Sequence, residues 1–420
     1  MSGPQASGKH RMSHITVIGC DGGALPEGAA AALAAARCVV GARRHLDSVK
    51  PPPGAEQIEL RGVDAALGTA CAHPGPVAVL ASGDPGFFGI VRLLRARGVR
   101  PQVIPAVSSV ALAFARLGLP WDDAVVLSAH GRDPRRVLAA ALGCAKSAIL
   151  TAPGRDAGPE RFIPPLVTAG RDVYVAERLG TTGERLTSVT AAAQGAAPGA
   201  SQFADPNIVV AVDPETVLPR PGHEPGEPGW IAGHRGAPSC WALPEDAFRH
   251  RDSMITKAEV RALVLARLGP GPGRTVWDIG AGSGSVAIEC ARFGAHAVAV
   301  ESDPPQCEHI RANAAAHGVR VQVVAGLAPS ALDELPPADA AFCGGGKDDV
   351  VAAVVRTQPP RIVATLASVD RVRSVRDLLD GAGYRADGTQ LQASRLAGIP
   401  GGSVRLTAAN PVFVLWGELP

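Results

Sequence analysis

The chain has 420 residues, a length that favours two domains, and its 46% apolar content suffices for sizeable cores. A formal net charge of +2 argues against nucleic-acid binding through bulk charge, so we expect no nucleic-acid partner. The eight cysteines stand singly, without a CxxC pair or a disulfide framework, which predicts a cytoplasmic protein with no metal site. The N-terminus lacks a signal-peptide core, and the best membrane candidate, AAAALAAARCVV, is short and interrupted by Arg37, so we expect no membrane association.

Short apolar runs alternate with Ala- and Leu-rich segments over residues 14–213. Runs such as HITVIG, VAVLASG and NIVVAV predict buried strands, and residues 26–36 and 108–117 predict helices. This alternation indicates an α/β layer architecture. Residues 214–240 are rich in proline and glycine and have no periodicity, which predicts a linker between two domains.

The alternation restarts in residues 241–420. Five strand-like runs, each followed by a helical segment, are TVWDIG, HAVAVES, RVQVVAG, ADAAFCGG and RIVATLA. The chain ends on the apolar run NPVFVLWGEL, which predicts an added terminal strand. Five strand–helix units of this kind predict a mostly parallel, doubly wound sheet.

A glycine-rich turn follows the first of these strands, with the residues Gly280, Ala281, Gly282, Ser283 and Gly284. Glycines allow a tight turn and remove the Cβ atoms that would hold a ligand away from the backbone. The carboxyl ends of parallel strands face the ligand crevice of such a sheet. A GxGxG turn alone is a weak indication, because many such matches are only tight turns.

Three neighbouring features strengthen the ligand interpretation. Asp278 lies on the strand just before the turn, and Glu301 ends the next strand, where an acidic group can accept hydrogen bonds from both ribose hydroxyls. The third strand ends at small residues, with Ala328 fitting the wall of an adenine pocket. The spacing differs from the GxGxxG of dinucleotide sites, and no GxxxxGK[ST] phosphate loop occurs. An adenosine ligand without a pyrophosphate remains, and S-adenosylmethionine fits.

Several stretches resemble a known enzyme family. MITKAEVRALVLARL, VWDIGAGSGSVAIECAR and AFCGGGKDD are similar to the C-terminal domain of the decarboxylating precorrin-6Y C5,15-methyltransferases, fused two-domain enzymes of cobalamin biosynthesis. ASGDPGFFGIVRLL, IPAVSSVALAFARLGLPWDDA and LSAHGR resemble the tetrapyrrole methyltransferases, in which two α/β lobes clasp S-adenosylmethionine. The resemblance spans nearly the whole chain. It implies a two-lobed tetrapyrrole methyltransferase domain at 14–213, the linker at 214–240 and a Rossmann-like methyltransferase and decarboxylase domain at 241–420.

The resemblance also implies cofactor contacts in the first domain. The GDPG turn places Gly83 and Asp84 in the cofactor cleft, although this tetrapeptide is also common turn chemistry. Ser108 and Ser109 offer hydroxyl groups, a role compatible with capping a helix. The first glycine loop starts at Gly19 but reads GCDGG where the family usually has GxGPGG. The family's Pro-Gly-Ile-Ser-Ser is Pro-Ala-Val-Ser-Ser here, and both changes keep small residues.

In the second domain the resemblance places Thr256 beside the cofactor and makes Lys257 a partner for a substrate carboxylate. Thr256 and Glu259 also fit a T-x-x-E capping box at the start of a helix. Gly344 and Gly345 follow the fourth strand, where absent side chains would let a flat ring approach the methyl group. No catalytic residue is assigned with these patterns alone; Lys257, Gly344 and Gly345 are the candidates.

The implied substrate is a reduced tetrapyrrole fringed with carboxylates, which calls for arginine and lysine side chains. The candidates are Arg43, Arg44, His130, Arg132 and Arg395, although most arginines of any protein are solvated surface residues. The implied reaction is S-adenosylmethionine-dependent methylation of a precorrin at C5 and C15 with decarboxylation of an acetate side chain. Two alternatives stay open, an NAD-dependent oxidoreductase and a non-catalytic tetrapyrrole carrier. We further expect a homo-oligomer.

Overall fold

The computed structural model describes residues 14–25, 27–189, 203–215, 238–251 and 255–420. Contacts divide the chain into two compact units. One comprises the chain up to residue 122 with 148–163 and 172–210, and the other comprises 123–147, 164–171 and 211–420. Most of the predicted linker, 216–237, lies outside the described residues, so the predicted domain limits stay a prediction.

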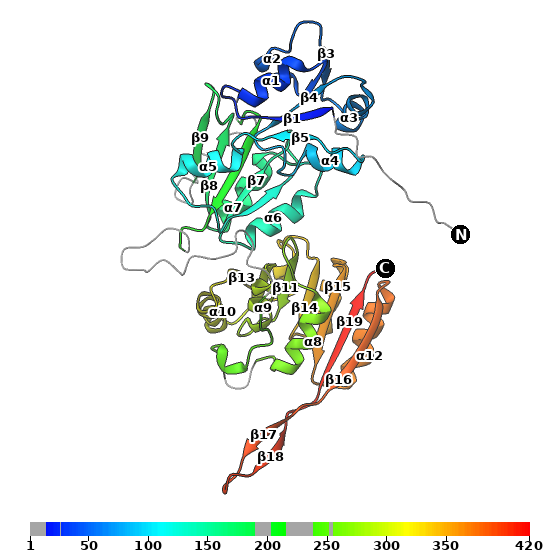
Figure 1. The fold of residues 1–420 in the computed structure, drawn as a ribbon. Helices are drawn as coiled ribbons and strands as arrows, with labels where there is room; N and C mark the ends of the chain where they lie inside the picture. Colours follow the sequence, from blue (N-terminus) through cyan, green and yellow to red (C-terminus); the bar gives the residue numbers. More distant parts are fainter. Residues whose placement is uncertain (1–13, 26, 190–202, 216–237, 252–254) are drawn as a thin grey trace, which may run out of the picture. The chain divides into compact units, whose positions relative to one another are not determined.

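The first unit contains a five-stranded parallel sheet of order β3-β2-β4-β1-β5 (Figure 1). Its strands are β1 (Ile15–Cys20), β2 (Cys38–Gly41), β3 (Glu56–Glu59), β4 (Val77–Ser82) and β5 (Gln102–Ile104). Its helices are α1 (Glu27–Ala35), α2 (Arg43–Val49), α3 (Val63–Ala72) and α4 (Ile90–Ala96). Ile15 and Val17 pack with α3 on one face, while Ile18 packs with α1 on the other. Burial of both faces explains why these strands read as continuous apolar runs.

A second five-stranded sheet has the order β6-β7-β10-β8-β9, and its last two strands are antiparallel. The strands are β6 (Val125–Ser128), β7 (Lys146–Leu150), β8 (Asp172–Glu177), β9 (Arg185–Val189) and β10 (Asn207–Val212). The accompanying helices are α5 (Ser109–Leu117), α6 (Pro134–Leu142) and α7 (Pro159–Thr168). The predicted strands of this region are confirmed, whereas β3 and β9 were not predicted because their side chains are largely exposed and not apolar.

A seven-stranded sheet of order β13-β12-β11-β14-β15-β19-β16 forms the C-terminal part. Its strands are β11 (Thr275–Ile279), β12 (His296–Glu301), β13 (Val321–Ala325), β14 (Ala340–Cys343), β15 (Arg361–Leu366), β16 (Arg385–Leu391) and β19 (Val412–Glu418). The first five positions in this order are parallel, and β19 runs antiparallel to both β15 and β16. The predicted mostly parallel sheet with an added terminal strand is therefore confirmed.

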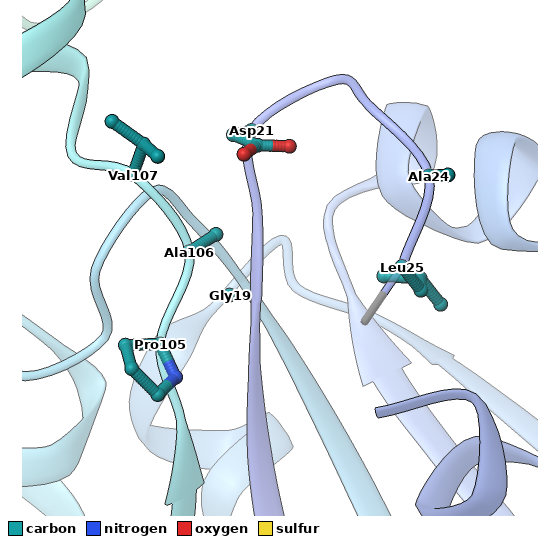
Figure 2. Close-up of a pocket in the computed structure, with 7 residues that line it drawn as sticks. All are labelled: Gly19, Asp21, Ala24, Leu25, Pro105, Ala106 and Val107. Atoms are coloured by element: carbon teal, nitrogen blue, oxygen red, sulfur yellow. The ribbon is translucent and has the colours of Figure 1, made fainter. Parts of the chain in front are cut away.

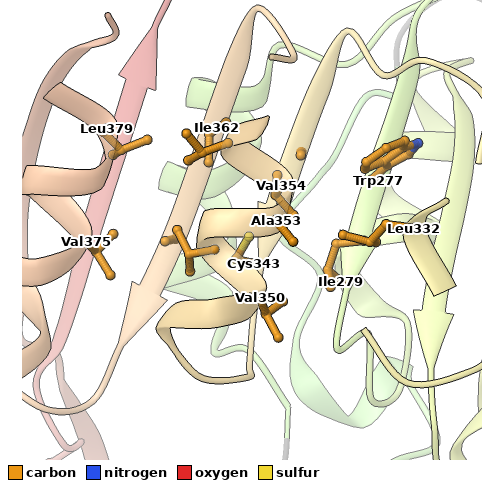
Figure 3. Packing of buried hydrophobic residues seen from close by; sticks show 14 of the residues in the cluster. Trp277, Ile279, Leu332, Cys343, Val350, Ala353, Val354, Ile362, Val375 and Leu379 are labelled. Carbon is orange, nitrogen blue, oxygen red and sulfur yellow. The ribbon is translucent and has the colours of Figure 1, made fainter. Parts of the chain in front are cut away.

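Helices cover both faces of this sheet. They are α8 (Ala258–Leu268), α9 (Ser285–Arg292), α10 (Pro304–Ala316), α11 (Asp348–Arg356) and α12 (Asp370–Gly381), with short 3-10 turns η2 (Glu245–Ala247) and η3 (Ser330–Leu332). Figure 3 shows one core, in which Trp277 and Ile279 of β11 pack in the same cluster as Val354 of α11 and Leu379 of α12. Val276, which points to the opposite face of β11, packs with Val264 of α8 and Val286 of α9.

A hairpin of β17 (Ser394–Gly398) and β18 (Val404–Ala408) extends beyond the sheet (Figure 1). Leu396 pairs directly with Leu406, and both side chains are largely exposed, at 73% and 68%. Val404 lies on the same side of the ribbon and is 61% exposed. One side of this two-stranded ribbon is thus apolar and uncovered by the described chain.

A buried ion pair fixes the segment that leads into α8. Arg261 of α8 and Glu289 of α9 are fully buried, with Nε and Oε1 3.2 Å apart. Arg261 also donates to the carbonyl oxygens of Leu243 and Thr256. Glu289 accepts from the Leu243 N–H at 2.7 Å and from Arg292 at 3.1 Å. Because every charge in this network has hydrogen-bonded partners, the desolvation cost of burying it is offset.

We predict that Glu289→Ala strongly destabilises the protein, because it leaves the Arg261 guanidinium buried without a counter-charge. The expected loss is about 3–5 kcal/mol in the free energy of unfolding, measured by denaturant titration of the full chain. Glu308→Ala is the matched control, since Glu308 pairs with Arg311 on the surface of α10. Its expected loss is below about 1 kcal/mol. Equal losses for the two variants would contradict the assignment of Glu289 as a structural anchor.

Candidate functional site

The glycine turn of the second unit joins β11 to α9 through residues that favour glycine. Gly280, Gly282 and Gly284 have φ values of 71°, 55° and 74°, in the left-handed region. A Cβ on Gly284 would lie only 2.9 Å from side-chain carbons of Ile310 on α10. The turn therefore depends on glycine for both its backbone conformation and its close packing.

Glu301, at the end of β12, holds this turn in place. Its Oε2 accepts from the Gly282 N–H at 2.8 Å, and its Oε1 accepts from the N–H groups of Ser302 and Asp303 at 2.8 and 2.9 Å. Each carboxylate oxygen has two lone pairs, so Oε2 keeps an acceptor position beside the turn. The predicted ribose acceptor and the glycine turn are thus brought together by the pairing of β11 with β12.

Asp278, on the strand before the turn, contacts the helix that follows it. Its Oδ2 accepts from the N–H of Ala287, the third residue of α9, at 2.9 Å, so the carboxylate caps the helix from the neighbouring strand. Its Oδ1 is buried and has no hydrogen-bond partner in the described structure. Burial, with a smaller contribution from the charge of Glu301, raises the pKa of Asp278 to about 7, although the hydrogen bond from the Ala287 N–H acts in the opposite direction.

The other predicted residues of this sheet edge lie on two adjacent loops. Gly344 follows β14, and its N–H donates to the Ile279 carbonyl at 3.1 Å. A Cβ on Gly280 would be 3.4 Å from the backbone of Gly345, so the two glycine loops lie against each other. Ala328 follows β13, whose end is joined to Glu301 by the N–H of Gly326. The residues that follow the glycine loop after β14 contribute to a surface pocket of about 480 Å³. It is lined by Lys347, Asp348, Asp349 and Arg371.

The predicted capping box at Thr256 is wrong. Lys257 occupies the N-cap position of α8 and makes no side-chain cap hydrogen bond. Glu245 takes the role instead, because its Oε1 accepts from the Ala258 N–H at 2.9 Å. Glu259 pairs with Arg395 instead.

Arg395 of β17 pairs with both Glu245 and Glu259. Its Nη1 lies 2.7 Å from Glu245 Oε2, and its Nη2 lies 2.6 Å from Glu259 Oε2. Hydrogen bonds to Arg395 lower the pKa of Glu245 to about 2. Two carboxylates thus pair with Arg395 at the start of α8, and its contact with a substrate carboxylate stays a prediction. Thr256 and Lys257 lie beside this ion-pair cluster in the sequence.

The first unit holds a pocket at the carboxyl ends of β1 and β5. It has a volume of about 380 Å³, and Figure 2 shows its lining residues, which are Gly19, Asp21, Ala24, Leu25, Pro105, Ala106 and Val107. A Cβ on Gly19 would clash with the carbonyl oxygen of Gly83 and the N–H of Ala106, so three strand ends converge there. Both sequence departures from the family, GCDGG and Pro-Ala-Val, therefore line this pocket.

The predicted contacts Gly83, Asp84, Ser108 and Ser109 lie at the same sheet edge. Gly83 has a φ of 60°, and a Cβ there would be 3.2 Å from Ser108 Cα and Ser109 N. Asp84 Oδ1 accepts from the Gly86 N–H at 2.8 Å, which is the turn interpretation of the GDPG motif. Ser108 caps α5 by accepting from the Ala111 N–H at 3.1 Å, as expected. The ligand roles of these residues stay predictions.

The predicted substrate-binding arginines differ in their surroundings. Arg43 pairs with Asp47 one turn along α2 and is exposed. Arg44, the next residue, instead donates to the Ser82 hydroxyl at the end of β4, at 2.9 Å. His130 and Arg132 lie exposed in the turn after β6, and Arg132 donates its N–H to the Ala129 carbonyl. Sequence reasoning did not single out Ser82, because a serine at a strand end carries no motif.

Two kinds of feature are absent from the residues that the structure describes. No helix in this part of the chain is long and apolar enough to span a bilayer. Within the same ranges, no group of three or more His, Cys, Asp or Glu side chains is arranged to hold a metal ion.

Comparison with known proteins defines the class. Residues 17–194 match the family model described as Tetrapyrrole (Corrin/Porphyrin) Methylases. Residues 246–415 match the model described as Precorrin methyltransferase domain. The chain is therefore an α/β methyltransferase with a tetrapyrrole methylase domain and a precorrin methyltransferase domain.

Relatives identify the particular family. A precorrin-6Y C(5,15)-methyltransferase [decarboxylating] of Sinorhizobium sp is 36% identical over 375 residues, 85% of each chain. The enzyme of that name from Mycobacterium tuberculosis is 34% identical over 300 residues, 69% of this chain and 67% of its own. A probable cobalt-precorrin-6B C(15)-methyltransferase (decarboxylating) of Pyrobaculum calidifontis is 33% identical over 41% of this chain and 93% of its own. The chain belongs to the family of decarboxylating precorrin-6Y C(5,15)-methyltransferases, as the sequence resemblance indicated. Nothing in these matches supports an oxidoreductase or a carrier.

We predict that Asp278→Asn flattens part of the pH dependence of stability. With a pKa of about 7, the folded state keeps the Asp278 proton over a pH range in which the unfolded state has lost it. The contribution of Asp278 to stability therefore falls as pH rises from about 4 to 7, by up to about 4 kcal/mol. Denaturant titrations of both proteins across this range measure the difference. Asp349→Asn, at an exposed position in the first turn of α11, is the control and should keep the wild-type slope.

Proposed function

We propose that the protein transfers two methyl groups to a precorrin, at C5 and C15, and removes the carboxyl group of an acetate side chain. This is a step of cobalamin biosynthesis, carried out in the cytoplasm. The observation that carries the proposal is the match along 85% of the chain to an enzyme named for this reaction. Two methylase-type regions in one chain agree with two methylated carbons.

We assign one methylated carbon to each domain. Residues 14–213 form the two-lobed domain that methylates C5, residues 214–240 are the linker, and residues 241–420 form the Rossmann-like domain that methylates C15 and decarboxylates. The matches at 17–194 and 246–415 support these limits. So does the parallel sheet with helices on both faces in the second region.

S-adenosylmethionine is the methyl donor that the residues fit. The turn at Gly280–Gly284 has no Cβ at three of its five positions, and a bulkier residue at Gly280 would meet Gly345. Glu301 keeps an acceptor position beside the turn for a ribose hydroxyl. When bound, the cofactor supplies an electrophilic methyl group. In the first domain, a second molecule of S-adenosylmethionine would bind near the 380 Å³ pocket. The residues around it would be Gly19, Gly83, Asp84, Ser108 and Ser109.

The protein need not provide a nucleophile, because the reduced macrocycle supplies an electron-rich carbon. Its own tasks are to hold the ring about 3 Å from the methyl group, to keep water away and to bind the ring carboxylates. Gly344 and Gly345 leave room for a flat ring, and Lys257 offers a cation for a ring carboxylate. Arg43, Arg44, His130 and Arg132 are exposed and can meet carboxylates.

We further propose that a second copy of this chain covers the β17–β18 hairpin. Isolated two-stranded ribbons are marginally stable in water, and this one exposes Leu396, Val404 and Leu406 on a single side. Arg395, on the other side, is already engaged by Glu245 and Glu259. The apolar side is therefore the one available to another copy.

Mass analysis of the product tests the reaction and the division of labour together. Wild-type protein, given the reduced precursor and S-adenosylmethionine, should yield a product that has gained two methyl groups and lost carbon dioxide. Glu301→Ala removes the acceptor of the Gly282 N–H and of the ribose, so its product should gain one methyl group and keep the carboxyl group. Glu308→Ala, on the exposed face of α10, is the control and should match the wild type. A wild-type product with no added methyl would refute the proposal, and full activity of Glu301→Ala would refute the assignment of C15.

We predict that Leu396→Ser with Leu406→Ser reduces the oligomeric state. The two substitutions remove the central cross-strand pair of the apolar side. The subunits should therefore dissociate at a higher protein concentration than those of the wild type. Sedimentation velocity of the full chain measures this. Leu186→Ser, an exposed leucine on β9, is the control and should leave the state unchanged. An unchanged assembly in the double variant would show that the hairpin is not the contact.

A further inference from the structure

Three polar side chains of the first unit meet at the carboxyl ends of two neighbouring strands. Arg44 and His45 lie in the first turn of α2, directly after β2, and Ser82 is the last residue of β4. Because β2 pairs with β4 in parallel, these residues come to the same sheet edge. Arg44 Nη2 donates to Ser82 Oγ at 2.9 Å, and His45 Nε2 lies 3.2 Å from the same oxygen.

The protonation of His45 follows from its surroundings. The residue is 9% exposed, and burial together with the charge of Arg44 lowers its pKa to about 4, so the ring is neutral at pH 7. Its Nδ1 is buried and has no partner among the described residues. A hydrogen on Nδ1 would be an unpaired buried donor, which is rare in folded proteins. The ring hydrogen is therefore assigned to Nε2, which donates it to Ser82.

This assignment determines where the Ser82 hydroxyl points. Its oxygen accepts one hydrogen bond from Arg44 and one from His45, which uses both lone pairs. Its own hydrogen must then point away from both partners. Ser82 and Arg44 are exposed residues, so this hydrogen and the remaining Arg44 N–H groups are available to a ligand as hydrogen-bond donors.

The charges around Arg44 leave it a cation. Partial burial lowers the pKa of its guanidinium, while the negative charge of Asp205 raises it. A guanidinium remains protonated under these conditions. Asp205 is itself hydrogen-bonded by the Asn207 side chain, which donates to its Oδ1 at 3.1 Å.

The cluster shares its sheet edge with the pocket at Gly19. Ser82 pairs with Cys20 in the register of β4 with β1, and the next residue, Gly83, donates its N–H to the Cys20 carbonyl at 2.8 Å. Gly19, on the other side of Cys20, lines the pocket. Ser82 thus lies on a strand that adjoins the space proposed for the ligands, and Arg44 of α2 is hydrogen-bonded to it.

We propose that Arg44 and Ser82, with His45 as the positioning residue, form a carboxylate-binding subsite of the first domain. An outward hydroxyl beside a guanidinium offers the two donors that a carboxylate accepts. The inference rests on the proposed function, which supplies two sources of such a group: a side-chain carboxylate of the tetrapyrrole, or the amino-acid carboxylate of the methyl donor.

Methyl-transfer kinetics of the full chain, with labelled S-adenosylmethionine and the reduced tetrapyrrole, test the subsite. Arg44→Gln should raise one KM by about tenfold or more, since it removes a charge-assisted hydrogen bond. Ser82→Ala should raise the same KM by severalfold. Arg61→Gln, which removes an exposed arginine paired with Glu59 in the same unit, is the control and should change neither KM. Thermal unfolding of each variant verifies that it is folded.

Two further comparisons identify the carboxylate that binds and test the role of His45. A rise confined to the KM of the tetrapyrrole assigns the subsite to the substrate, and a rise confined to that of S-adenosylmethionine assigns it to the donor. His45→Leu should raise the same KM, and His45→Gln, which keeps a donor near the Nε2 position, should restore it; a merely structural role of His45 would not give this rescue.

The outcomes separate this inference from the proposed function. If the wild type transfers methyl groups but Arg44→Gln and Ser82→Ala keep both wild-type KM values, the subsite is refuted and the function stands. If the wild type transfers no methyl group to the tetrapyrrole, the proposed function fails and the subsite with it.

Discussion

The C-terminal site depends on two acidic side chains that accept from backbone N–H groups, one in the glycine turn and one in the helix after it. Glu301 of β12 accepts from Gly282, and Asp278 of β11 accepts from Ala287 at the start of α9. Without these acceptors the turn and the helix end would leave buried donors unpaired, which costs about 1–3 kcal/mol each. The parallel pairing of β11 with β12 brings both carboxylates to one edge of the sheet. The position of the turn, the start of α9 and the acceptor beside it are thus consequences of one arrangement.

The segment that enters α8 is fixed by charge in the same way. Arg261 and Glu289 hold the backbone at Leu243 and Thr256, and Glu245 both caps α8 and pairs with Arg395 of the hairpin. A buried ion pair adds little net stability over a well-packed apolar pair, but removing one member is costly. The pairs therefore act mainly to define one geometry. Through Arg395, the base of the hairpin is joined to the helix end where Thr256 and Lys257 lie.

Buried parallel strands could be predicted from the sequence, because burial on both faces makes them continuous apolar runs. The strands β3 and β9 and the hairpin β17–β18 could not, since their residues are mostly exposed and lack a continuous apolar run. The glycine turn and Glu301 were found from their spacing along the chain. The cap of α8 was assigned wrongly, because the sequence around Thr256 cannot reveal that Glu245 reaches Ala258. Arg43 and Arg44 look alike in sequence, and only the fold shows that one pairs with Asp47 and the other with Ser82.

These observations separate two kinds of contact that a site can make. Where the backbone is proposed to provide the contact, as at Gly19 and Gly282, the requirement is the absence of a side chain and, at Gly282, a positive φ. Small substitutions nearby, such as Ala106 and Val107 in place of Gly-Ile, then alter the wall of the pocket without removing a donor or acceptor. Where side chains are proposed to provide the contact, as with Arg44 and Ser82, the neighbouring side chains determine which hydrogen is available to a ligand. His45 and Arg44 both donate to the Ser82 oxygen, which leaves the Ser82 hydrogen as the free donor. The proposed donor sites therefore depend on the absence of side chains at Gly19 and Gly282, whereas the proposed carboxylate subsite depends on the identities of Arg44, His45 and Ser82.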